Sequence, residues 1–110
     1  MDNNLNPTLV HGQVLAWLGR SGADIRPHER DYIETRIYPP TGSGYFFTGR
    51  HQSQLWYYRD SPDADHFRRA EISEVETAIV QQGRVQVCGS RGISYGVWRT
   101  WDDFAREVLA

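Results

Sequence analysis

The chain has 110 residues, of which 39% are hydrophobic, 24% charged and 13% aromatic, and its formal net charge is -2. This length predicts a single domain, residues 1–110, and the aromatic content excludes a disordered tail. A net charge so close to zero excludes a protein that is held on nucleic acid or an anionic membrane by its overall field.

The basic residues of the chain are all arginine, and the chain contains no lysine. Schiff-base enzymes and P-loop proteins need a lysine amine, so both classes are excluded. A single cysteine, Cys88, excludes an internal disulfide and any site built from several thiolates. We therefore predict no cofactor, and we expect Cys88 to be a small buried residue rather than a nucleophile.

The first residues, 1–4, are polar and lack the basic region of a secretory signal. The longest apolar run, Val14–Leu18, has five residues, against about 20 that are needed to cross a bilayer. Both observations predict a cytoplasmic protein that makes no membrane contact.

The first predicted helix has Asn6 as its N-cap and Pro7 as its first residue, where a missing N–H costs nothing. Glycines at positions 19 and 22 end this helix. Its predicted buried face consists of Val10, Val14, Trp17 and Leu18.

Alternation of polar and apolar residues predicts strands over 32–38, 45–48 and 54–59, which form an antiparallel meander. An acidic loop over 60–65 precedes a second predicted helix, which should cover the sheet with Ile72, Val75 and Ile79.

A hairpin follows, in which the turn Gly89–Gly92 joins strands over 84–88 and 93–99. Thr100, with Asp103 three residues later, predicts the capped start of a last helix that docks through Phe104 and Val108.

These elements predict an α+β fold of order α-β-β-β-α-β-β-α, in which a five-stranded antiparallel sheet, a meander plus a hairpin, packs its helices on one face. The order is similar to that of bacterial type III secretion chaperones. This resemblance implies a role in binding another protein.

The stretches 35–59 and 77–101 contain no carboxylate, and each carries three arginines. Half of the aromatic residues lie in the first stretch, and the strand over 54–59 carries bulky rings on both faces. Because helices can cover only one face, we expect Leu55 and Tyr57 on the covered side and an exposed Arg and aromatic surface opposite. Its predicted binding residues are Arg36, Tyr38, Trp56, Tyr58 and Arg84.

Arginine and aromatic side chains dominate protein-binding hot spots, and they also stack on nucleic-acid bases. We predict a non-enzymatic binding protein, a small bacterial or phage accessory protein of the inhibitor, immunity or chaperone type. Its partner would be another protein or a second copy of the chain in a homodimer. The alternative is a single-stranded nucleic-acid-binding module that uses the same face.

A third hypothesis is a small nuclease or hydrolase, which would use His28, His51 or His66 as a general base. The group Asp63–His66 contains three side chains of types that bind metals, but no second cluster completes a ligand set. We therefore predict no catalytic residue and no metal site.

Overall fold

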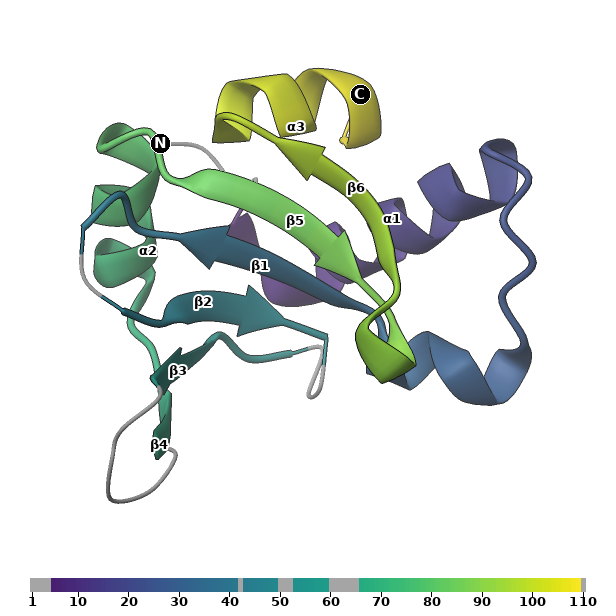
Figure 1. Ribbon diagram of the computed structural model, residues 1–110, viewed down its shortest axis with the longest axis horizontal. Helices are drawn as coiled ribbons and strands as arrows, with labels where there is room; N and C mark the ends of the chain where they lie inside the picture. The colour runs from purple at the N-terminus through teal and green to yellow at the C-terminus, as the bar shows by residue number, and fades with distance from the viewer. Residues whose placement is uncertain (1–4, 42, 50–52, 60–65, 110) are drawn as a thin grey trace.

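The computed structural model describes residues 5–41, 43–49, 53–59 and 66–109, and its strands form one sheet. Neighbouring strands are all antiparallel and lie in the spatial order β4-β3-β2-β1-β5-β6 (Figure 1). The elements in chain order are α1 (Pro7–Arg20), η2 (Pro27–Tyr32), β1 (Glu34–Tyr38), β2 (Tyr45–Thr48), β3 (Trp56–Arg59), β4 (His66–Arg69), α2 (Ile72–Val80), β5 (Arg84–Cys88), η3 (Ser90–Gly92), β6 (Ser94–Trp98) and α3 (Trp101–Val108). The α+β class predicted from the sequence is confirmed.

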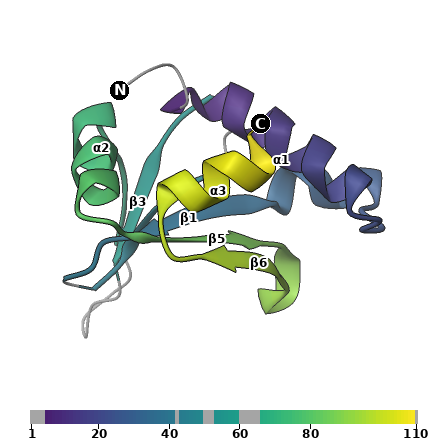
Figure 2. The same cartoon turned by 90° about the horizontal axis from the view of Figure 1, so that it is seen from above.

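Helices α1, α2 and α3 lie on the same side of the sheet (Figure 2). Their apolar faces and the inward side chains of the strands form the core, in which Val14, Val75, Val85 and Phe104 are fully buried. Leu55, which precedes β3, is buried and Tyr57 of β3 packs against this core, so both point to the covered side as expected. No described helix has the length and apolar character that a membrane span requires.

The local signals of α1 act as expected. The side chain of Asn6 accepts a hydrogen bond from the backbone N–H of Leu9 at 3.0 Å, and Pro7 is the first helical residue. Trp17 differs from the prediction because it is only half-buried: it packs against the core and meets Trp98 edge to face, with 5.4 Å between ring centroids.

In α3, the Thr100 hydroxyl accepts a hydrogen bond from the backbone N–H of Asp103, which confirms the predicted cap.

The prediction of five strands was wrong, because β4 adds a sixth at the free edge of β3. The sequence His66–Arg69 has no apolar alternation and all four of its residues are exposed. This segment forms a strand because its backbone pairs with β3. On the covered side, Arg68 forms two hydrogen bonds to the Glu74 carboxylate of α2, at 2.8 and 3.0 Å. With this extra strand, the observed element order differs from the predicted order on which the resemblance to the secretion chaperones rested.

The predicted cover from α2 is only partly correct. Val75 and Ala78 are buried and Ile79 packs against the core, but Ile72 is 52% exposed. Ile72 is the first residue of a nine-residue helix, so it lies at the rim of the core rather than over it. Glu71 and Glu74 close a capping box there, with the N–H of Glu71 bonded to the Glu74 carboxylate at 3.0 Å.

Candidate functional site

The face of the sheet opposite the three helices, which we call the open face, carries side chains in two cross-strand rows. The register pairs Tyr38 with Arg84, and it pairs Tyr45 with Tyr58 and Tyr58 with Phe67. The Tyr38 and Tyr45 rings join these pairs, with centroids 5.2 Å apart. The first row, here called the aromatic row, is therefore Arg84, Tyr38, Tyr45, Tyr58 and Phe67, from β5 to β4.

Each ring of the aromatic row touches the next. Tyr45 and Tyr58 have centroids 5.2 Å apart, Tyr58 and Phe67 have centroids 4.8 Å apart, and the planes are tilted by 43° and 45°. The Arg84 guanidinium lies 4.6 Å from the centroid of the Tyr38 ring and extends the row onto β5. Tilted ring pairs contribute about 0.5–1.5 kcal/mol each beyond the area they bury. The side chains of the row thus pack against one another within the protein itself.

The second row is Gln86, Arg36, Phe47, Trp56 and Arg69, and Arg36 is held at its centre. Its Nε donates to the Glu34 carboxylate at 2.9 Å, its Nη1 lies 3.3 Å from the Tyr38 hydroxyl, and its guanidinium lies 4.5 Å from the Tyr45 ring centroid. Burial by itself would lower the pKa of Arg36, but these hydrogen bonds with Tyr38 and Glu34 more than offset it, so the pKa is raised. Arg36 is therefore a permanently charged residue whose side chain connects Glu34, Tyr38 and Tyr45 on the open face.

Part of the open face is buried by its own side chains. Phe47 is only 2% exposed and Cys88 is buried, although their register partners Arg36 and Glu34 place both on this face. Burial raises the pKa of the Cys88 thiol, and Glu34 adds to the rise while Arg36 opposes it. Cys88 is therefore a neutral thiol in an enclosed position, in agreement with the prediction of a small buried residue.

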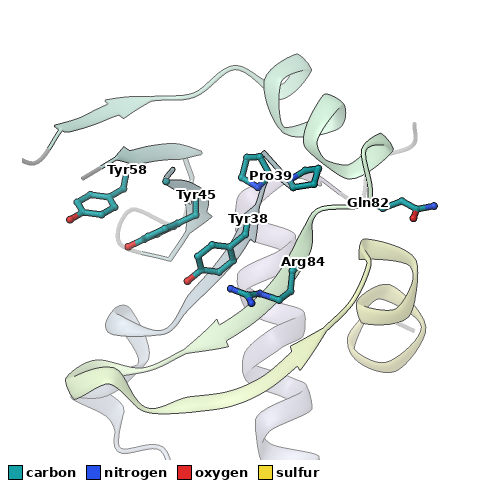
Figure 3. A pocket seen from close by; sticks show the side chains of 8 residues that line it. Tyr38, Pro39, Tyr45, Tyr58, Gln82 and Arg84 are labelled. Atoms are coloured by element: carbon teal, nitrogen blue, oxygen red, sulfur yellow. The ribbon is translucent and has the colours of Figure 1, made fainter. Parts of the chain in front are cut away.

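A pocket of about 550 Å³ opens along most of the aromatic row, at the end of the sheet where β1 and β3 end and β2 and β5 begin. Figure 3 shows Tyr38, Tyr45 and Tyr58 extending in the same direction, with Arg84 beside Tyr38. Pro39 and Pro40 complete the wall, and Gly44 and Gln82 complete the lining. Pockets for small ligands have about 300–1,000 Å³, so this one is large enough for several side chains of a partner.

Gly44 sets the approach of the β1–β2 connection to this pocket. Its φ is +110°, a conformation that suits glycine, and a Cβ atom there would lie 2.4 Å from the backbone oxygen of Tyr58. A side chain at this position would push the connection away from β3. The absence of a side chain at residue 44 therefore helps to define the pocket.

The structure brings the five predicted binding residues together on the open face. Tyr38, Tyr58 and Arg84 belong to the aromatic row and line the pocket, whereas Arg36 and Trp56 lie in the second row. Their role in binding stays a prediction.

Sequence reasoning missed two members of the aromatic row, Tyr45 and Phe67. The alternation of Tyr45 with Phe46 in the strand over 45–48 could have placed Tyr45 on the open face. Phe67 had no such signal, because it lies on the strand that was not predicted.

Of the histidines predicted as alternative catalytic residues, the structure describes His28 and His66, which lie on different elements. His28 Nε2 lies 3.9 Å from a Glu29 carboxylate oxygen on the exposed helix η2, and His66 is exposed on β4. His51, Asp63 and Asp65 lie outside the residues that the structure describes. Within the described ranges, no three His, Cys, Asp or Glu side chains form a group that could hold a metal ion.

The chemistry of the open face follows from its protonation states. Burial raises the pKa of Tyr45 to about 12, with Arg36 opposing the rise, so this phenol stays neutral at ordinary pH. The aromatic row and the pocket thus present ring surfaces, hydroxyl groups and the N–H groups of Arg84. Groups of these kinds can make apolar contacts and donate hydrogen bonds to acceptors of a partner.

No family model, curated protein or solved structure matches this chain.

Proposed function

We propose that this chain is a non-enzymatic binding protein that recognises another protein through the open face of its sheet. The observation that carries this proposal is the aromatic row, a continuous line of four rings and one arginine that no described helix covers. Tyr, Trp and Arg are enriched among the residues that dominate binding energies. A surface that is already packed loses little side-chain entropy when a partner binds.

The geometry favours a protein over a single-stranded nucleic acid. Stacking of bases needs accessible ring faces. In the aromatic row, Arg84 lies over one face of the Tyr38 ring and Arg36 lies over one face of the Tyr45 ring. Neighbouring rings, tilted by 43–45°, occupy further ring surface. What these rings offer is edges and hydroxyl groups, which suit the irregular surface of a folded or extended protein.

A capture experiment tests this proposal with two variants of the open face and one control. Phe67, at the β4 edge, is 50% exposed, and Trp56 of the second row pairs with Arg69 of the same strand. Val80 on α2 is 75% exposed on the helix side, so Val80→Ala removes an exposed apolar side chain from the opposite surface. The immobilised wild-type chain and the variants Phe67→Ala, Trp56→Ala and Val80→Ala are each exposed to an extract of the source cells, and bound proteins are quantified.

We expect a protein that wild type and Val80→Ala retain equally and that both open-face variants bind at least tenfold less, which is about 1.4 kcal/mol. Circular dichroism checks that the variants fold. Partner binding unaffected by either open-face variant contradicts the proposal. A labelled oligothymidine strand provides the opposing test: tight binding that falls steeply with salt would show a nucleic-acid module instead. Sedimentation velocity of the purified chain measures its mass in solution and would reveal a dimer if the partner is a second copy of the chain.

A further inference from the structure

The charge in the pocket distinguishes it from the rest of the open face. Among the residues that the structure describes, Arg84 is the only charged residue that lines the pocket, and none of those lining residues is a carboxylate. In the described part of the chain, Arg36, Arg68 and Arg106 each form an ion pair, with Glu34, Glu74 and Asp103 respectively. Among the same residues no carboxylate lies within ion-pair distance of Arg84. Its positive charge is thus available to an anionic group of a partner.

The guanidinium of Arg84 is also held in place. It lies 4.6 Å from the centroid of the Tyr38 ring, and the hydroxyl of Tyr38 in turn donates to the Gln86 side chain at 3.3 Å. Gln86 is itself bonded to the Ser94 hydroxyl at 2.9 Å. A guanidinium presents its N–H groups in one plane, and contact with a ring restricts the position of that plane, which suits a carboxylate that accepts two hydrogen bonds.

Most of the remaining residues that line the pocket are prolines and tyrosines. Pro39, Pro40 and the three tyrosines line it, and neither kind of side chain has much freedom to lose. Proline rings and tyrosine edges of this kind make apolar contacts with a proline or an aromatic side chain, as aromatic-lined grooves do when they receive extended peptides. The volume of about 550 Å³ accommodates this side chain together with the adjacent residue.

We propose that the pocket binds an acidic peptide segment of the protein partner, in which a proline or aromatic residue stands next to an aspartate or glutamate. The ring packs against the prolines and tyrosines that line the pocket, and the carboxylate accepts hydrogen bonds from Arg84. This inference rests on the proposed function and specifies the chemistry of the partner at one end of the open face.

A random peptide library displayed on phage tests the inference, with selections carried out in parallel on wild type, Arg84→Gln and Arg106→Gln. Arg106 lies on α3 and is exposed, so its variant loses the same charge on the helix side. We expect wild type and Arg106→Gln to enrich peptides with an acidic residue beside a proline or aromatic residue. The best peptide, labelled with fluorescein, should bind Arg84→Gln at least tenfold more weakly than wild type in anisotropy titrations.

Charge reversal gives a second, independent measurement. The Arg84→Glu chain should bind poorly to the selected peptide, and binding should recover when lysine replaces the acidic residue of that peptide. Selected peptides without acidic residues, equal binding to Arg84→Gln, or no enrichment on wild type would each overturn the inference. If Phe67→Ala abolishes capture of the protein partner while Arg84→Gln does not, the inference fails and the proposed function stands. If neither variant affects capture, the proposed function itself fails.

Discussion

Individual arginines on the open face differ in what their charge does. Arg36 is half-buried, bonded to Glu34 at 2.9 Å and packed on the Tyr45 ring, so its charge is used within the protein. Arg84 is exposed and stacks on Tyr38. The two residues look alike in the sequence, since each alternates with apolar residues in a strand. Only Arg84 offers its hydrogen-bond donors to a partner at the pocket.

His11 is a buried imidazole on α1, and it predicts a pH dependence of stability. Burial lowers the pKa of His11 below its ordinary value of 6.5, and the carboxylate of Asp31 opposes this only in part. The unfolded chain therefore takes up a proton at a higher pH than the folded chain. The contribution of His11 to the free energy of unfolding is complete above the unfolded pKa, and it is lost as the pH falls through the lowered pKa of the folded state.

Urea unfolding between about pH 7.5 and 5 measures this effect. As the pH is lowered from 7.5 to 5, we expect the free energy of unfolding of wild type to decrease. The decrease should be smaller in His11→Gln, which cannot titrate at this position. An identical pH dependence in the two proteins would contradict the assignment to His11.

At the scale of elements, β4 shows how a strand can form without a sequence signal of its own. Its residues are exposed and mostly basic, so local preference contributes little. The strand forms because β3 presents an unpaired edge and because Phe67 contacts the Tyr58 ring on the open face. The Arg68–Glu74 ion pair ties β4 to α2, but both side chains are substantially exposed, and such pairs stabilise by at most about 1 kcal/mol.

Helix α1 docks through Trp17 as well as through its fully buried residues. The Trp17 ring meets Trp98 edge to face, and Trp98 in turn contacts Phe104 of α3 with 5.2 Å between centroids. We expect Trp17→Ala to lower the free energy of unfolding by about 3 kcal/mol, the lower end of the range for Trp to Ala, because Trp17 is half-buried. Leu9→Ala, an exposed position of the same helix, is the control and should cost less than about 1 kcal/mol. Equal costs, measured by urea unfolding, would show that Trp17 does not anchor α1.

At the scale of the whole molecule, the described strands share one sheet and the helices share one core. The radius of gyration is 13.3 Å, close to the roughly 13 Å of a compact domain of this size. We predict that the chain unfolds in a single cooperative step. Thermal transitions followed by far-ultraviolet circular dichroism and by tryptophan fluorescence should coincide, because Trp56 reports on the open face and Trp17, Trp98 and Trp101 report on the helix side. Two separate transitions would show that the sheet and its helices unfold independently.

The sequence alone determined the features that depend on local chemistry and on periodicity. Asn6 with Pro7 and Thr100 with Asp103 marked two helix starts, because their side chains or rings satisfy the requirements of the first turn directly. Alternation in the strand over 54–59 separated Leu55 and Tyr57 from Trp56 and Tyr58, because successive side chains of a strand point to opposite faces. From this the α+β class and most of the open face could be predicted.

Tertiary structure alone decided the features that depend on which strands become neighbours. The strand β4 exists because β3 has a free edge, and Phe67 joins the aromatic row only through that pairing. The register between β1 and β2 puts Tyr45 against Tyr38, and the register between β1 and β5 puts Arg84 over the same ring. Register is set by the packing of all strands at once, so a pocket formed where four strands begin or end has no signature in any one of them.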